Sequence, residues 1–151
     1  MSGLVLAIDG PSGSGKSSTA KAIALRANWS YLDTGALYRA VTYLALDNKV
    51  DTEDSVTDLL NKHEITFDTN PAEPKIFLDE KDISEEIRFQ RINDLVSQIS
   101  AMVGVRKILL DMQRKYIAEA PIGIVVEGRD IGTVVAPNAQ LKIYLHADIS
   151  A

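Results

Sequence analysis

The segment LVLAIDGPSGSGKSS, residues 4–18, contains the pattern that decides the fold. Residues 4–8 form a short, continuous apolar run, which is typical of a central strand in a parallel sheet. A glycine-rich turn closes this run, and from Lys16 the apolar residues recur with the period of a helix. The expected helix face consists of Ala20, Ile23, Ala24 and Ala27. A buried strand, a glycine turn and a helix in this order predict an α/β domain.

Strands and helices continue to alternate further along the chain. Residues 29–32 form a second strand candidate, and the helix that follows has an apolar face made of Leu37, Ala40, Val41 and Leu44. Residues 123–126 and 141–145 are also apolar runs, and we expect both to be buried strands. The whole pattern predicts a doubly wound parallel sheet.

The middle of the chain has a different pattern. Residues 51–62 predict a polar helix, and the apolar residues in 65–67 and 76–78 alternate with polar ones, which predicts a hairpin. Two helices come next, with apolar faces formed by Ile92, Leu95, Val96 and Ile99 and by Val105, Ile108, Leu109 and Met112. We interpret roughly residues 50–90 as a subdomain inserted into the main domain.

Composition limits the classes of function. The chain has 151 residues, 46% of them hydrophobic and 25% charged, which suits one soluble domain. Its net charge of −5 argues against a protein that coats nucleic acid, although a few placed cations can still hold a small anion. There are no cysteines, and the apolar run near the N-terminus is too short for a membrane span and lacks a basic flank. We therefore expect a cytoplasmic protein.

The glycine-rich turn, residues 10–17, fits the pattern G-x-x-x-x-G-K-[ST] between a predicted strand and a predicted helix. Glycines let backbone N–H groups surround a phosphate, and the start of the helix adds the positive end of its dipole. Lys16 supplies a cation for the outer phosphates and Ser17 a hydroxyl for magnesium. The predicted ATP-binding residues are Gly10, Pro11, Ser12, Gly13, Ser14, Gly15, Lys16, Ser17 and Ser18. The alternative is a turn that caps a helix and binds nothing.

The tetrapeptide Asn48-Lys49-Val50-Asp51 matches a guanine-recognition pattern, but its context favours another interpretation. It follows a predicted helix and precedes another, whereas guanine recognition requires a buried strand before the motif. We expect a helix end and a turn, with Asp51 or Thr52 capping the next helix.

Two polar segments follow predicted strands. VVEGRDIGT, residues 125–133, ends an apolar run in two acids, a glycine and an arginine, and DTGALYR, residues 33–39, follows the second strand. Open α/β sheets bind ligands at the carboxyl ends of their strands, so both segments are candidate parts of a site. Asp9 and Asp33 also end strands; each is either a further partner of magnesium or a cap.

Four ordered segments together resemble the bacterial cytidylate kinase family of the nucleoside monophosphate kinases. They are IDGPSGSGKSS (8–18), YLDTGALYRA (31–40), VSQISAMVGVRKILLDMQR (96–114) and VVEGRDIGTVVAPNAQLKIYL (125–145). The resemblance covers residues 4–145 and implies a P-loop kinase domain in which residues 34–100 form the monophosphate-binding part. It implies phosphoryl transfer from ATP to CMP or dCMP, with Mg²⁺ as cofactor. It further implies a monomer that acts on a small molecule, without a nucleic-acid or membrane partner.

The resemblance assigns roles to individual residues. Arg39 and Arg129 match the arginines that hold the acceptor phosphate, and Thr34 matches a hydroxyl residue beside them. Glu127 stands where the family has an Asp or a Glu near the reacting phosphates. Lys16, Arg39 and Arg129 are accordingly the expected catalytic residues, and Ser17 the expected metal ligand.

Ser97, Arg106 and Asp130 match the residues that bind the base of the acceptor. Asp130 and Ser97 can accept from the amino group of cytosine, while Arg106 can donate to its ring and carbonyl acceptors. Uracil reverses the donor at this edge, so the same site would leave buried polar groups unpaired. This chemistry predicts selection of cytosine over uracil.

The family continues beyond IYLHADISA, residues 143–151, into an arginine-rich lid, a last strand and a helix. We expect these parts to be absent here and turnover to be weak, because an arginine that stabilises phosphoryl transfer contributes about 10³-fold or more. Two alternatives stay open at this point. One is a P-loop kinase for another small acceptor, and the other is a nucleotide-binding module without turnover.

Overall fold

A parallel sheet of four strands, in the order β2-β6-β1-β7, organises the first of two structural units. Its strands are β1 (Leu4–Asp9), β2 (Ser30–Asp33), β6 (Gly123–Gly128) and β7 (Leu141–Tyr144). The structure is a computed structural model that describes residues 3–11 and 13–146. The first unit comprises Met1–Gly35, Thr69–Pro74 and Gln113–Ala151, and the second comprises Ala36–Asp68 and Lys75–Met112.

The strand order confirms the predicted doubly wound sheet and the central place of β1. The connection from β1 leads to β2 on one side of the sheet, whereas the connection from β6 leads to β7 on the other side. β1 and β6 are neighbours, so the direction of winding reverses between them. Ligands of open α/β sheets bind at the carboxyl ends of strands at such a reversal. Here those ends are Asp9 and Gly128, which are paired in register.

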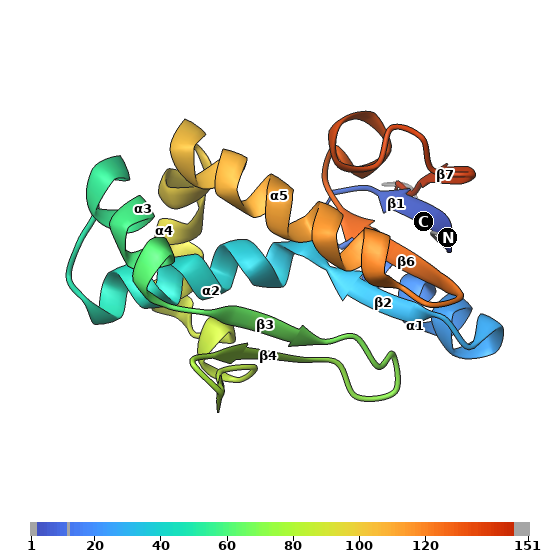
Figure 1. Cartoon of the computed structure of the whole chain (residues 1–151), viewed down its shortest axis with the longest axis horizontal. Helices are drawn as coiled ribbons and strands as arrows, with labels where there is room; N and C mark the ends of the chain where they lie inside the picture. Colours follow the sequence, from blue (N-terminus) through green and yellow to red (C-terminus); the bar gives the residue numbers. More distant parts are fainter. Residues whose placement is uncertain (1–2, 12, 147–151) are drawn as a thin grey trace. The chain divides into compact units, whose positions relative to one another are not determined.

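Alternation along the strands gives the sheet two buried faces. One face carries Leu6, Ile8, Tyr31 and Val125, which pack with Ala20 and Ala24 of α1 (Lys16–Ala27). Figure 1 shows α1 along the sheet. The opposite face carries Ala7, Leu32, Ile124 and Val126, each at most 1% exposed. Burial on both faces explains why these strands read as continuous apolar runs. The predicted face of α1 is confirmed except for Ala27, which is exposed.

The expectation that residues 141–145 form a buried strand is wrong in its burial. β7 pairs with β1 alone among the described strands, and Leu141 and Tyr144 are 56% and 66% exposed. An apolar run indicates a strand, but it does not distinguish a strand in the middle of a sheet from one at its edge. In β7 only Ile143 is partly buried.

The second unit contains helices and an antiparallel sheet. Helix α2 (Thr34–Asp47) starts in the first unit and runs into the second, and α5 (Val103–Glu119) runs back. The other elements are α3 (Glu53–Lys62), β3 (Ile65–Asp68), β4 (Lys75–Leu78), β5 (Lys81–Asp82), η1 (Glu86–Arg88) and α4 (Gln90–Ser100). One apolar cluster joins them, with Leu44, Ile83, Ile92 and Leu109 among its fully buried members.

The local predictions for the second unit are largely confirmed. Strands β3 and β4 form the expected antiparallel hairpin, with Phe67 opposite Ile76, and β5 adds a third strand that the pattern did not predict. Thr52 is the N-cap of α3, because its hydroxyl accepts a hydrogen bond from the Ser55 N–H at 3.3 Å. Residues 48–51 therefore lie in the turn between α2 and α3, as their context indicated.

Across residues 3–11 and 13–146, every helix is too short or too polar to cross a bilayer.

Candidate functional site

The glycine-rich turn connects β1 to α1, as its motif requires. Gly13 and Gly15 adopt left-handed backbone angles, with φ values of 80° and 82°, where a side chain would introduce strain. Gly15 is the N-cap of α1 and has no side chain with which to cap the first turn. The N–H groups of the first turn are thus left for a ligand such as phosphate. Ser12, one of the predicted phosphate-binding residues, lies outside the described residues.

Lys16 and Ser14 contribute polar side chains to this turn. The Lys16 ammonium lies 3.4 Å from the Pro11 carbonyl oxygen, to which it donates. The Ser14 hydroxyl is inaccessible to solvent and has no hydrogen-bond partner among the described residues. Buried polar atoms are normally hydrogen-bonded, so an unpaired hydroxyl inside the turn fits a loop that closes around a polar ligand.

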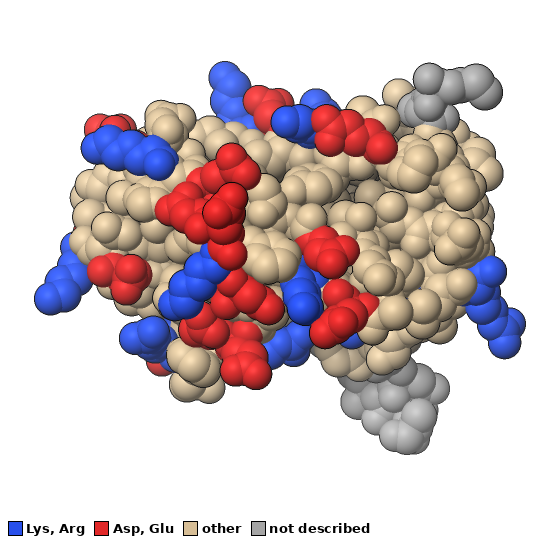
Figure 2. All heavy atoms as spheres, turned by 60° about the horizontal axis from the view of Figure 1, so that its bottom comes forward, with Lys and Arg blue, Asp and Glu red and all other residues tan. Residues whose placement is uncertain are grey.

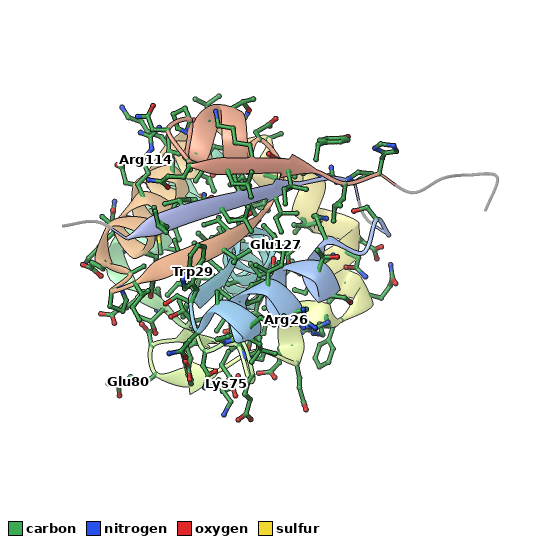
Figure 3. All side chains as sticks on the ribbon, turned by 90° about the vertical axis from the view of Figure 1, so that its right-hand side faces the viewer. Arg26, Trp29, Lys75, Glu80, Arg114 and Glu127 are labelled. Carbon is green, nitrogen blue, oxygen red and sulfur yellow. The ribbon has the colours of Figure 1, made fainter. Side chains whose placement is uncertain are left out.

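Glu127 is the buried acid of the site, with only 1% of its surface exposed. It is paired in register with Ile8 on one side and Asp33 on the other, so its side chain lies on the face of the sheet that α1 covers. Figure 3 shows Glu127 in the interior beside α1. The Tyr31 hydroxyl donates a hydrogen bond to Glu127 Oε1, and Ser17 lies near the same carboxyl group, where it favours the charged form.

Burial and charge change the proton affinity of this pair. Burial, with the nearby Asp33 carboxylate as a second cause, raises the pKa of Glu127 above its ordinary value. Burial, together with the charges of Asp33 and Glu127, also raises the pKa of the Tyr31 phenol. Lys16 acts in the opposite direction on Glu127, because a cation favours the carboxylate. A carboxyl group with a raised pKa beside a lysine and a strand end is typical of a functional site.

The oxygen atoms at this end of the sheet suit a magnesium ion that is bound mainly by the phosphates of a nucleotide and by water. The Ser17 hydroxyl and the Glu127 carboxyl group supply oxygen, the donor that Mg²⁺ prefers. The described residues contain no group of three or more acids, histidines or cysteines that would form a protein cage for a metal. Mg²⁺ in phosphate sites usually keeps several waters and binds one or two protein groups plus phosphates. The residues present fit that mode of binding.

The segment after β6 is held at both ends by charged side chains. Asp130 adopts a left-handed conformation, with φ of 57°, and a short π-helical turn, η2 (Ile131–Val135), follows it. The Asp9 carboxylate accepts hydrogen bonds from the N–H groups of Ile131 and Gly132. Asp9 thus caps η2, which is the second of the two roles expected for it.

The other end of η2 is bound by Arg114 of α5. Its guanidinium donates hydrogen bonds to the carbonyl oxygens of Val134 at 2.9 Å and of Val135 at 3.3 Å. Figure 3 shows Arg114 on the side of the sheet away from α1. Carboxylate at the amino end and guanidinium at the carboxyl end complement the backbone groups that a short helical turn leaves unpaired.

Thr34 and Gly128 approach each other closely. The Thr34 hydroxyl donates a hydrogen bond of 2.9 Å to the carbonyl oxygen of Glu127, and Thr34 is 3% exposed. A Cβ atom on Gly128 would lie 2.0 Å from that hydroxyl oxygen, so only glycine fits there. This contact explains the glycine between Glu127 and Arg129.

The second unit holds three of the residues assigned to the acceptor. Arg39 is half-buried and donates hydrogen bonds to the Asn93 side chain and to the Ile87 carbonyl oxygen. Asn93 and Ser97 are four residues apart on α4 and therefore share one face of it. Both Ser97 and Arg106 are exposed.

The structure groups the predicted residues by unit. Lys16, Ser17, Glu127 and Thr34 meet at the carboxyl end of the sheet in the first unit, and Arg129 and Asp130 extend from it as exposed residues. Arg39, Ser97 and Arg106 belong to the second unit. Their roles toward a nucleotide stay predictions.

Three polar residues that contact the site were missed from the sequence: Tyr31, Asn93 and Arg114. Tyr31 had a signal, because it lies two residues before Asp33 in one strand and therefore on the same face. Asn93 and Arg114 carried none, since each looked like an ordinary polar residue of a helix.

On the face shown in Figure 2, Asp and Glu side chains lie among those of Lys and Arg, so this face of the described chain has no extended basic surface.

Comparison with known proteins gives consistent matches. A family model described as cytidylate kinase matches residues 6–151. The cytidylate kinase of Streptomyces coelicolor is 50% identical over 150 residues, which cover 98% of this chain and 65% of that protein. The cytidylate kinase of Carboxydothermus hydrogenoformans is 46% identical over 144 residues, 94% of this chain and 64% of that protein. The cytidylate kinase of Streptococcus sanguinis is 45% identical, with 99% and 67% covered. The chain thus spans about two thirds of the length of these curated relatives.

Proposed function

Because the chain belongs to the cytidylate kinase family, we propose that it forms the nucleotide-binding part of an enzyme that transfers a phosphoryl group from ATP to CMP or dCMP. The observation that carries the proposal is the pairing of Asp9 with Gly128 at the reversal of the sheet. This pairing makes the phosphate-binding turn after β1 and the Gly128-Arg129-Asp130 segment after β6 neighbours. Donor and acceptor phosphates need to lie in line for transfer, and adjacent strand ends support that arrangement.

The donor side rests on the turn between β1 and α1. Its backbone N–H groups and the start of α1 would bind the β- and γ-phosphates of ATP. Lys16 would neutralise the phosphoryl group in transfer, because charge spreads over its oxygens in the transition state. Ser17 and Glu127 would hold the magnesium of Mg·ATP, which supplies positive charge between the β- and γ-phosphates.

The acceptor side rests on family assignments and on local geometry. Arg129 and Asp130 are exposed at the carboxyl end of β6, on a segment held by Asp9 and Arg114. An arginine there can bind a phosphate through two parallel hydrogen bonds. We propose Arg39 as the second arginine for the acceptor phosphate, since Asn93 orients its guanidinium.

Ser97, Arg106 and Asp130 are proposed to select cytosine, as the family pattern indicates. A site built to pair with the amino group of cytosine leaves buried groups unpaired when uracil binds, and such mismatches discriminate strongly. Thr34 has its hydroxyl proton committed to the Glu127 carbonyl oxygen, so toward the acceptor it would act only as a hydrogen-bond acceptor.

In the proposed reaction an oxygen of the CMP phosphate attacks the γ-phosphorus of ATP as the bond to the β-γ bridging oxygen breaks. The products are CDP and ADP, and no covalent intermediate with the protein forms. Lys16, Arg39 and Arg129 would position the two reacting phosphates and compensate their negative charge. That the 151-residue chain turns over weakly stays a prediction.

Isothermal titration calorimetry of the purified chain with CMP, dCMP, UMP, AMP and GMP tests the proposal, after circular dichroism has shown that the chain is folded. We expect binding of CMP and dCMP, and UMP affinity lower by about 100-fold or more. Equal binding of several bases would favour a kinase of another acceptor. A folded chain that binds ATP but none of the five would contradict the assignment of the acceptor residues.

A further inference from the structure

Tyr31 is a buried tyrosine in the interior of the first unit whose hydroxyl contacts the acid of the proposed site. It is 2% exposed, and its hydroxyl donates a hydrogen bond to Glu127 Oε1. The two residues come from adjacent strands that lie far apart in the sequence. Nothing in the motif of the phosphate-binding turn requires a tyrosine at this place in β2.

Strand register explains why the two side chains meet. β2 and β6 are parallel, with Tyr31 opposite Val125 and Asp33 opposite Glu127. Side chains alternate along a strand, so Tyr31, Asp33 and Glu127 share one face. Tyr31 lies opposite Val125, two residues before Glu127. The length of the phenol side chain lets its hydroxyl reach the Glu127 carboxyl group diagonally.

The other contacts of Glu127 lie toward the phosphate-binding turn. Ser17 and Lys16 lie close enough to its carboxyl group to lower the pKa of Glu127. Asp33, on the same face, repels the charged form of Glu127. Ser17 also lowers the pKa of the Tyr31 phenol, so this exposed residue of α1 lies near both the phenol and the carboxyl group.

A glutamate has one more rotatable bond than an aspartate, so a strand end alone does not fix where its carboxyl group lies. A donor fixed in the core can remove that freedom. Groups that hydrogen-bond a metal ligand orient it, and their loss typically lowers metal affinity by about 10- to 100-fold.

We propose that Tyr31 is a positioning residue that holds the Glu127 carboxyl group beside the Ser17 hydroxyl, and thereby sets the affinity of the site for the magnesium of ATP. This inference rests on the proposed function, because it assumes that the turn binds Mg·ATP. Tyr31 itself does not reach the nucleotide in this scheme; it acts through Glu127 alone. We therefore expect Tyr31 to contribute to ATP binding only when magnesium is present.

The test is calorimetric titration of ATP into the whole chain, once with excess Mg²⁺ and once with EDTA. For the unchanged chain we expect tighter ATP binding with Mg²⁺, and we call the ratio of the ATP affinities with Mg²⁺ and with EDTA the magnesium gain. In Tyr31→Phe, which keeps the ring and removes the hydroxyl, we expect the magnesium gain to fall about 10-fold. ATP affinity in EDTA should stay the same. Titration of Mn²⁺ into the ATP complex, followed by electron paramagnetic resonance, reads the metal directly.

Glu127→Asp provides a second, independent variant. The shorter acid does not span the distance to the Tyr31 hydroxyl, so we expect a loss of the magnesium gain similar to that in Tyr31→Phe. Combining the two substitutions should add little, because both remove the same interaction. Additive losses would show that Tyr31 and Glu127 act separately and would overturn the proposal.

Tyr43→Phe is the matched control, since Tyr43 is also buried and its hydroxyl accepts a hydrogen bond from Lys81, an exposed lysine of the second unit. It should leave the magnesium gain unchanged. A Tyr31→Phe chain that keeps the full gain, or that loses ATP binding equally in EDTA, would overturn the proposal and make Tyr31 a core residue only. An unchanged chain that binds ATP without any gain from Mg²⁺ would also overturn it. An unchanged chain that binds neither ATP nor CMP would instead refute the proposed function.

Discussion

Both carboxylate oxygens of Asp9 are bonded to the backbone at the start of η2, at 2.7 Å to the Ile131 N–H and 3.0 Å to the Gly132 N–H. The last residue of β1 therefore fixes the segment that follows β6. Since the phosphate-binding turn starts at Gly10, one side chain connects the two loops of the proposed site. Arg114 completes the arrangement at the other end of η2.

Asp9→Ala should destabilise the chain and loosen this segment. The substitution leaves two N–H groups without their partner, which costs about 1–3 kcal/mol of unfolding free energy. Urea denaturation measures the loss. Asp9→Asn is the control, because its amide oxygen keeps one acceptor, so its loss should be clearly smaller. Equal stability of Asp9→Ala and the unchanged chain would show that water replaces the carboxylate at no cost.

Gly128→Ala should be strongly destabilising. Its new Cβ atom would lie 2.0 Å from the Thr34 hydroxyl oxygen, inside the closely packed end of the sheet. Overpacking of this kind costs about 1–3 kcal/mol, and thermal denaturation measures it. Gly104→Ala in α5 is the matched control, because its nearest neighbours are side-chain atoms at 3.3 Å that can move. A Gly128→Ala chain that melts with the unchanged chain would contradict the close contact.

Glu127→Gln should change how stability depends on pH. The pKa of Glu127 is raised in the fold by burial first and by Asp33 second, from an ordinary value of 4.5. Between 4.5 and the raised value the folded chain keeps a proton that the unfolded chain has lost. The unfolding free energy from this group therefore falls as pH rises through that window. Glutamine removes this contribution and still accepts from Tyr31.

Urea denaturation at a series of pH values, from about 4 to about 8, tests this prediction. The difference in unfolding free energy between Glu127→Gln and the unchanged chain should grow with pH across the window. Glu119→Gln, which replaces an exposed acid of α5 by the same amide, is the control for the change of side chain. A difference that shrinks with rising pH would mean that the fold favours the charged form of Glu127.

Asn93→Ala should weaken CMP binding and leave ATP binding unchanged. Its side chain accepts a hydrogen bond from the Arg39 guanidinium, and without it Arg39 loses one of the two hydrogen bonds that orient it. We expect CMP affinity to fall about tenfold by calorimetry, as for the loss of a hydrogen bond to a charged group. Gln98→Ala, also exposed on α4, should have no effect. A loss of ATP affinity in Asn93→Ala would indicate general damage to the fold.

The sequence predicted what depends on local pattern. The apolar run before Gly10 and the change of period at Lys16 were sufficient to predict the sheet. The acids and the arginine after Val126 indicated a candidate site at the strand end, and the roles of these residues stay predictions. The short strand β5 was missed, because Lys81–Asp82 is too short to show alternation. The predicted burial of β7 was wrong, because the exposure of a strand depends on whether it has a neighbouring strand and not on its own apolarity.

The contacts of single side chains were harder to predict. Tyr31 and Glu127 meet through the register between β2 and β6, and Arg39 meets Asn93 through the packing of α2 and α4. Both contacts join residues far apart in the chain, and their partners follow from tertiary geometry. A single sequence gives the type of residue at each place but not which distant partner it will contact.

The pairing of β1 with β6 also has a consequence for how the molecule comes into being. β1 is made before β6, and β2 and the whole second unit lie between them in the sequence. Contacts so distant in sequence form slowly, because a long loop must close before they are made. During synthesis on the ribosome, β1 therefore lacks its neighbour in the sheet until Gly123–Gly128 has emerged. Nucleotide capture is expected to begin only after β6 has emerged.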